Sequence, residues 1–255
     1  MAFSSCIEWT ESTWNPVTGC TKISLGCQHC YAERMAHRLK GMGSPRYRNG
    51  FRVTLHHDAL SLPAAWQKPQ MIFVNSMSDL FHQAVPLSFV REVFAVIAAC
   101  PRHTFQVLTK RAERLAEIAH RLPWPDNVWI GVTVEAAQYL PRLDHLRAVP
   151  AAVRFVSFEP LLGPVEDVDL DGIHWVIVGG ESGPASRPMD AAWARHIRDQ
   201  CLEAGVPFFF KQWGGVRKRE AGRMLDGRVW EQLPHPRPDR AATPPAGTLQ
   251  LAPAR

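Results

Sequence analysis

Three cysteines close together near the start of the sequence are the clearest chemical feature of the chain. Cys20, Cys27 and Cys30 fall within eleven residues, in the string CTKISLGCQHC. Thiolates at such short spacing are typical of a bound metal ion or an iron–sulfur cluster. Gly19 and Gly26 each precede one of these cysteines and let the backbone fold tightly around a cofactor. The sequence therefore predicts a metal centre held by these three thiols.

Three thiols fit a 4Fe–4S cluster better than a zinc ion, because a structural zinc site normally has four protein ligands. A cluster held by three cysteines keeps one iron free for a substrate or cosubstrate. His29 or His37 would supply a fourth ligand to zinc, so a zinc site stays an alternative, as does a loop without metal. The residues after Cys30 predict a helix, and its N-terminal dipole would favour an anionic cluster.

The composition indicates one globular domain. A length of 255 residues suits a single α/β barrel, and a hydrophobic fraction of 46% supplies a large core. No apolar run reaches the length of about 18 residues that a membrane span needs. The first residues do not resemble a secretory signal, so we expect a cytoplasmic protein whose six cysteines form no disulfide framework. Cys6, Cys100 and Cys201 are interpreted as buried side chains.

Behind the cysteines, short apolar runs alternate with longer helix-like stretches. The runs cover residues 71–74, 104–108, 128–134, 153–158, 174–178 and 207–210, and the helices 88–99, 111–121, 137–147 and 191–204. This alternation predicts parallel strands joined by helices in a partial TIM-like (β/α) barrel, with an open doubly wound sheet as the competing architecture. We expect the domain to span residues 1–233, and residues 234–255, rich in Pro, Ala and Arg, to form a flexible tail.

Each apolar run ends in polar residues. The carboxyl ends of parallel strands open on one face, where active sites are built. We therefore expect a shared polar site formed by the residues at these ends: Ser76, Asp79, Thr109, Lys110, Glu135, Glu159, Glu181 and Lys211. The alternative is that each residue caps the following helix or lies in a solvated loop. Gly179 and Gly180 open a glycine-rich turn, GGESG, that lets backbone amides approach a ligand.

The net charge is +5, but an excess of four positive charges comes from the residues after Gly215, so the rest of the chain is nearly neutral. The charge therefore does not indicate a generally basic surface for binding nucleic acid. One stretch is locally basic. From Arg34 to His57 the chain has six Arg or Lys residues and no acid. This stretch follows the cysteines directly, so it is either a solvated surface or a contact for an anionic substrate.

The string from Cys27 to Ala32, CQHCYA, ahead of a helix and a series of βα units, resembles radical S-adenosylmethionine (SAM) enzymes. Their usual spacing is CxxxCxxC, whereas here six residues separate the first two cysteines. Thr109-Lys110 and Glu159-Pro160 are similar to strand ends in the spore photoproduct lyase-like branch of that superfamily. The resemblance implies a radical-SAM-like barrel, a 4Fe–4S cluster on the three cysteines, and SAM.

Longer strings resemble the phage three-cysteine-motif family, named after phage gene products thirty-seven and sixty-eight. They are WNPVTGC from Trp14, FVNSMSDLF from Phe73, FQVLTKR from Phe105, SFEPLLGP from Ser157, VGGESGP from Val178 and FFFKQWG from Phe208. The chain is also similar to proteins encoded beside a three-Cys-motif partner protein, which implies a protein partner.

Together these features predict a radical SAM enzyme, a lyase or transferase, acting on nucleic acid or a nucleotide. The expected catalytic residues are Lys110, Glu135, Glu159 and Lys211. The residues expected to bind SAM or substrate are Ser76, Asp79, Thr109, Gly179, Gly180 and Glu181. One alternative is a non-catalytic binding module stabilised by zinc or a cluster. Another is a metal-dependent hydrolase or nuclease that binds magnesium through Asp79, Glu135, Glu159 and Glu181.

Overall fold

The computed structural model describes residues 7–234, except for the side chains of residues 218 and 219. Its centre is a seven-stranded sheet in which all neighbours pair in parallel, in the order β1-β4-β5-β6-β7-β8-β9. The strands are β1 (Ser12–Trp14), β4 (Met71–Val74), β5 (Thr104–Thr109), β6 (Val128–Thr133), β7 (Val153–Phe158), β8 (Trp175–Gly179) and β9 (Phe208–Gln212). A doubly wound sheet reverses its strand order at a switch point, and this sheet does not. The predicted partial barrel is therefore confirmed.

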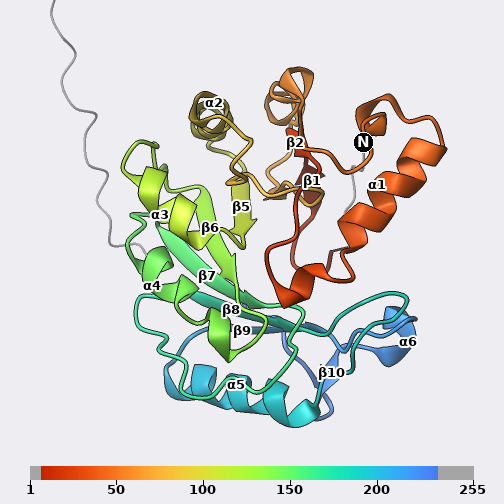
Figure 1. The fold of residues 1–255 in the computed structure, drawn as a ribbon. Coiled ribbons are helices and arrows are strands. Elements are labelled where there is room, and N and C mark those ends of the chain that lie inside the picture. Colours follow the sequence, from red (N-terminus) through yellow and green to blue (C-terminus); the bar gives the residue numbers. More distant parts are fainter. Residues whose placement is uncertain (1–6, 235–255) are drawn as a thin grey trace, which may run out of the picture.

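Helices follow most strands and lie on the outside of the curved sheet (Figure 1). The α-helices are α1 (Tyr31–Gly41), α2 (Leu87–Ala99), α3 (Ala112–Ala119), α4 (Arg142–Arg147), α5 (Ala191–Glu203) and α6 (Lys218–Ala221). Single 3-10 turns are η1 (Leu25–Cys27), η2 (Pro45–Tyr47), η3 (His57–Ala59), η4 (Pro63–Ala65) and η5 (Ala137–Tyr139). Two antiparallel pairs complete the fold, β2 (Val17–Thr18) with β3 (Thr54–Leu55), and β10 (Met224–Leu225) with β11 (Arg228–Val229).

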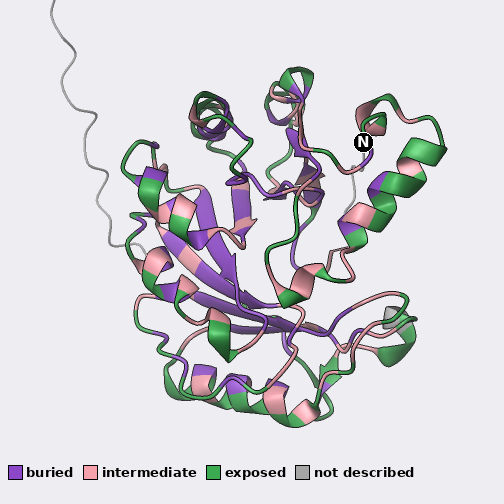
Figure 2. Ribbon diagram, viewed as in Figure 1, coloured by how far each residue is buried: buried purple, intermediate pink, exposed green. Residues whose placement is uncertain are grey.

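Alternate residues of each strand face opposite sides of the sheet, and both sides are apolar. Residues such as Val107, Ile130 and Val176 face the helices in the main core. The inner side carries an aromatic cluster around Trp175, whose ring lies 5.6 Å from that of Phe155 and 5.9 Å from those of Trp129 and Phe209. Figure 2 shows the strands as an almost continuous buried layer. The cluster fills the amino-terminal part of the inner side and leaves the carboxyl end to polar residues.

Two differences from the sequence-based expectation have a clear physical cause. The short strand β1 was not predicted, since its three residues Ser-Thr-Trp form no apolar run. The expected helix over 137–147 is divided into η5 and α4, with Pro141 at the N-cap of α4. Pro lacks the amide hydrogen needed inside a helix, so a break at this position is expected physically. No helix in the described part of the chain has the length and apolar character needed to span a membrane.

Candidate functional site

The cysteine loop, residues 20–30, begins at a tight backbone contact. The Gly19 amide donates to the Met77 carbonyl at 3.0 Å, and the Cys20 amide donates to the Phe51 carbonyl at 3.2 Å. Gly19 has a φ of +82°, and a Cβ at this position would collide with the carbonyl of Arg52. Glycine is therefore required here for two reasons, its left-handed backbone and the close approach of another segment of the chain. The contact fixes the start of the loop next to the residues that follow β4.

The middle of the loop lies against Glu135, at the end of β6. The Ser24 hydroxyl donates to the Glu135 carboxylate, and a Cβ at Gly26 would lie 2.6 Å from the same side chain. The Glu135 side chain is fully buried, and its charge is balanced by Arg142, 2.7 Å away, and by Lys110, 3.5 Å away. Sequence reasoning identified Lys110 and Glu135 as site residues, and the structure brings them together.

The end of the loop lies against Glu181, in the turn after β8. His29 Nδ1 is 3.2 Å from Glu181 Oε2, and Arg187 binds the same carboxylate through Nε at 2.9 Å and Nη2 at 2.5 Å. Arg187 Nη2 also donates to the Leu25 carbonyl of the loop at 3.0 Å. Burial raises the pKa of Glu181, but the hydrogen bonds from Arg187 and His29 outweigh it and hold the pKa at about 2. Glu181 is thus ionised at neutral pH and anchors the loop.

The three loop thiols are free and partly exposed, in contrast to the buried Cys100 and Cys201. Cys20 Sγ lies 3.8 Å from Arg111 Nη2, and Cys27 Sγ lies 3.4 Å from the Ser24 hydroxyl. Burial, together with the nearby charge of Asp79, raises the pKa of Cys20 to about 11 although Arg111 opposes the shift. Cys30 is the N-cap residue of α1, so the predicted helix after the third cysteine is confirmed.

Within residues 7–234, no group of three or more Cys, His, Asp or Glu side chains is placed closely enough to hold a metal ion. Ligation by the three loop thiols therefore stays a prediction. The chemistry of the donor set fits an iron–sulfur cluster, since all three thiols are free, partly exposed and belong to one loop. Cys6 lies outside the described residues.

Asp79, which follows β4, forms hydrogen bonds with neighbouring residues of the protein. Its carboxylate accepts hydrogen bonds from the Thr109 hydroxyl at 2.8 Å and from the amides of Phe81 and Lys110 at 3.0 and 3.1 Å. The Ser76 hydroxyl donates to Asn15 Oδ1, and the Ser76 carbonyl accepts from Tyr31. The predicted ligand-binding residues Asp79 and Thr109 thus lie together over β4 and β5, whereas Ser76 contacts Asn15, after β1, and Tyr31, at the start of α1.

A second polar group lies over β7, β8 and β9. The Lys211 amino group donates to the Glu159 carboxylate, and Gly179 lies between these two residues. The Ser157 hydroxyl, one step deeper on the same side of β7, is buried without a hydrogen-bond partner among the described residues. Gly180 has a different reason to be glycine, because a Cβ there would collide with the carbonyl of Trp213.

The predicted site residues follow strands of one parallel sheet and so share its carboxyl edge, but they form two groups. Asp79, Thr109, Lys110 and Glu135 lie over β4 to β6, whereas Glu159, Gly179, Lys211 and Glu181 lie over β7 to β9. Three arginines that bind members of these groups or the loop were not predicted from the sequence: Arg111, Arg142 and Arg187. Arg142 follows Glu135 by seven residues and Arg187 follows Glu181 by six. Such unequal spacings do not identify ion pairs without knowledge of the fold.

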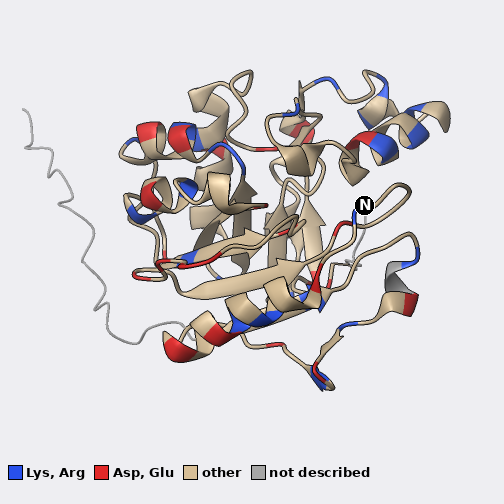
Figure 3. Ribbon diagram, turned by 60° about the horizontal axis from the view of Figure 1, so that its bottom comes forward, with Lys and Arg blue, Asp and Glu red and all other residues tan. Residues whose placement is uncertain are grey.

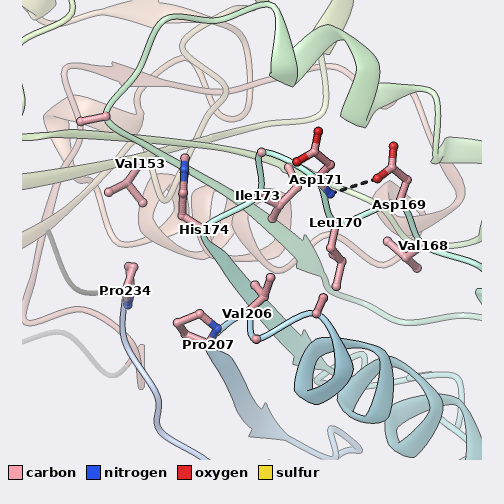
Figure 4. A pocket seen from close by; sticks show the side chains of 14 residues that line it. Val153, Val168, Asp169, Leu170, Asp171, Ile173, His174, Val206, Pro207 and Pro234 are labelled. Atoms are coloured by element: carbon pink, nitrogen blue, oxygen red, sulfur yellow. Dashed lines mark hydrogen bonds between the residues drawn. The ribbon is translucent and has the colours of Figure 1, made fainter. Parts of the chain in front are cut away.

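One cavity lies at the opposite end of the sheet. It has a volume of about 590 Å³ and lies before β7, β8 and β9, where Val153, His174 and Pro207 line it (Figure 4). A hydrogen bond of 3.0 Å from the Asp171 amide to Asp169 Oδ1 shapes its wall. None of the predicted site residues lines it. A smaller cavity of about 430 Å³ lies at the carboxyl edge, between α3 and α4, and Lys110 lines it.

Three solved structures of spore photoproduct lyase are similar to the chain. The complex with the dinucleoside spore photoproduct and a double mutant with bound AdoMet and the same photoproduct each show 12% identity and a TM-score of 0.46. Each alignment covers 78% of this chain and 63% of the lyase chain. A cysteine-to-serine mutant shows 14% identity and a TM-score of 0.45, covering 69% of this chain and 57% of the lyase. The chain thus spans less than two thirds of the lyase.

A search of curated protein sequences gave no match. A family model described as "Protein of unknown function (DUF5131)" matches residues 4–234, which include the cysteine loop and every strand of the sheet. The resemblance to the phage three-cysteine-motif family stays a prediction beside this match. The chain belongs to the DUF5131 family.

Proposed function

We propose that the chain is an iron–sulfur enzyme of the radical SAM type. The observation that carries the proposal is the position of the cysteine loop across the carboxyl ends of the parallel strands. Ser24 contacts Glu135 after β6, and His29 contacts Glu181 after β8, so the loop extends from β6 to β8 along this edge. Active sites of parallel α/β barrels lie at this edge.

In this proposal the thiols of Cys20, Cys27 and Cys30 hold a 4Fe–4S cluster. When bound, such a cluster supplies one electron that breaks a C–S bond of SAM. Cys20 needs a metal to ionise at neutral pH, because burial raises its pKa to about 11. Arg111, next to Cys20, then stabilises the thiolate.

The polar residues of the inner side would bind and orient SAM and the substrate. Ser157 supports a polar ligand at this position, since a buried hydroxyl without a partner costs free energy that a ligand would recover. Glu159 and Lys211 neutralise each other and offer both an acceptor and donors beside it. Asp79 and Glu181 act indirectly in this scheme, because their carboxylates hold Thr109 and the cysteine loop in place.

A nucleic acid or nucleotide is the proposed substrate. The basic stretch lies beside the cysteine loop, since the backbone of Arg52 contacts Gly19. Figure 3 shows Lys and Arg residues along α1. Arg38, Lys40, Arg48 and Arg52 are exposed, whereas Arg46 is bound to Asp58 at 2.6 Å and is less available to an anion. An origin in phage or mobile elements, a three-Cys-motif partner protein and a cytoplasmic location stay predictions.

The hydrolase alternative is less consistent with the charges. Each of its four carboxylates already faces a cation: Asp79 faces Arg111, Glu135 faces Arg142, Glu159 faces Lys211 and Glu181 faces Arg187. Magnesium would have to displace these partners. The binding-module alternative, stabilised by zinc or by a cluster, is separated from the enzyme by metal analysis and by turnover.

The test is anaerobic reconstitution with iron and sulfide, followed by incubation with SAM and dithionite. We expect about four irons and four sulfides per chain, absorption at about 400 nm, and release of 5′-deoxyadenosine. Cys20→Ala, Cys27→Ala and Cys30→Ala should each abolish cluster loading, while the control Cys100→Ala retains it. A chain that keeps one zinc and takes up no iron would refute the proposal, and a loaded cluster without SAM cleavage would leave a binding module.

A further inference from the structure

The 430 Å³ cavity between α3 and α4 is lined by more positive than negative side chains. Its lining comes from the cysteine loop, the segment after β4, the start of α3, and η5 with α4. Four cationic side chains and one acidic side chain line it, together with a histidine: Lys110, Arg111, Arg114, Arg142, Glu113 and His145. A cavity of this composition favours an anionic ligand.

Part of this positive charge is already neutralised inside the protein, and part is not. Glu135 is the one carboxylate that serves both Arg142 and Lys110, so one negative charge faces two positive charges. The Lys110 amino group is 3.5 Å from Glu135, which is longer than an ordinary charge-assisted hydrogen bond. Arg114 differs, because its guanidinium donates to the carbonyls of His82 and Val85 and therefore has a structural role.

Two further features of the lining supply donors. Arg111 Nε is buried and has no hydrogen-bond partner among the described residues, and the Arg111 side chain is only 9% exposed. The nearest carboxylate, that of Asp79, is 3.9 Å away. The first amides of α3 have no partner within their helix, and Arg111 does not cap them with its side chain. Arg111 Nη2 donates to the Thr21 carbonyl and hydroxyl, but the buried Nε lacks an acceptor, and such a donor favours a ligand or water that accepts a hydrogen bond.

We propose that this cavity binds a phosphate group of a nucleic-acid strand whose reacting base lies under the cysteine loop. The inference rests on the proposed function and adds the place of substrate contact. A phosphate carries several acceptor oxygens and matches the planar fork of arginine, as well as the amides at a helix N-terminus. The cavity also adjoins the loop directly, since Ile23 forms part of its lining and is 42% exposed beside it. A strand anchored here would therefore pass the three thiols.

The test introduces negative charge without removing a structural contact. Gln83 and Gln138 line the cavity and are exposed, and their side chains make no hydrogen bond among the described residues. Gln83→Glu and Gln138→Glu should each weaken binding of a labelled single-stranded oligonucleotide about fivefold at low salt. The double variant should also flatten the salt dependence, by a slope of roughly 0.7 for each phosphate that the protein no longer neutralises. The control is Gln67→Glu, on an exposed glutamine outside this lining whose amide donates to the Ala65 carbonyl at 3.4 Å, and it should bind as the wild type does.

The outcomes separate the two proposals. If the wild type binds no oligonucleotide, the nucleic-acid part of the proposed function fails, and this inference fails with it. If the wild type binds and the double variant binds equally well, the inference alone is wrong. If the charges weaken binding of a mononucleotide or inorganic phosphate but not of the oligonucleotide, the ligand is a free phosphate compound and the strand assignment is wrong. Circular dichroism of each variant checks that the fold is unchanged.

Discussion

Glu181 offers a sharp test of how the cysteine loop is anchored. Its side chain is 5% exposed and binds Arg187 and, in the loop, His29. The hydrogen bonds from these residues lower its pKa from 4.5 to about 2 against the opposing effect of burial. Because one pKa unit corresponds to about 1.4 kcal/mol, ionised Glu181 contributes about 3 kcal/mol to the free energy of unfolding at neutral pH. Glu181→Gln should remove most of this contribution.

The sign of the pH dependence follows from the lowered pKa. The folded protein binds a proton at Glu181 less readily than the unfolded chain, so the stabilisation is complete above pH 4.5 and is lost as the pH falls towards 2. Urea unfolding of the wild type and of Glu181→Gln, followed by circular dichroism, should therefore differ by about 3 kcal/mol at pH 7 and by much less at about pH 3. Comparing the two proteins at each pH removes the contribution of the other carboxyl groups.

The control is Glu203→Gln, on an exposed residue at the end of α5 that forms no ion pair within the described residues. It should change the free energy of unfolding by less than about 0.5 kcal/mol. A difference between wild type and Glu181→Gln that is the same at neutral and at acid pH would refute the electrostatic reasoning. No difference at neutral pH would show that the contacts with Arg187 and His29 do not stabilise the fold.

Two further predictions concern the backbone and the inner polar pair. Gly19→Ala should lower the free energy of unfolding by clearly more than Gly43→Ala, since both positions have a positive φ but only Gly19 meets a backbone carbonyl, and urea unfolding measures the difference. Equal effects would mean that the collision with Arg52 is relieved. Lys211→Met should destabilise by about 3 kcal/mol by leaving the largely buried Glu159 unpaired, whereas Lys211→Met with Glu159→Gln should regain most of this loss. If the effects of the two substitutions on the free energy of unfolding simply add, Lys211 and Glu159 are not coupled and the reasoning is wrong.

The fold was predictable because its signal repeats. Strands covered on both sides are apolar along their whole length, as Val128 to Thr133 shows, and the intervening helices have a different period. The short strand β1 lacked that signal, because its stability comes from pairing with β4 and from the burial of Trp14. The break in the helix over 137–147 was readable in principle from Pro141.

The site was predictable only to the level of the strand ends. Parallel strands bring the residues that follow them to one edge, so Lys110 and Glu135 were expected to be neighbours, and they are. The partners of the carboxylates were not predictable, since an arginine side chain reaches its partner from a helix or loop whose path depends on the whole fold. The division into two groups was not predictable either, because it depends on these partners: Glu135 pairs with Arg142 and Lys110, whereas Glu159 pairs with Lys211.

The attachment of the cysteine loop also bears on what the cysteines contribute. Thr21, Ser24 and His29 fix the loop to the barrel through their side chains, whereas among the three thiols only Cys20 lies close to a residue that follows a strand, Arg111. In a small zinc module the metal supplies much of the folding free energy, so folding depends on ligation. Here the extensive core of the barrel supplies that free energy. Substitution of a loop cysteine should therefore affect binding of the proposed cofactor far more than the stability of the fold. This behaviour is expected of an enzyme with a preformed barrel, whereas a metal-stabilised module would lose its fold together with its metal.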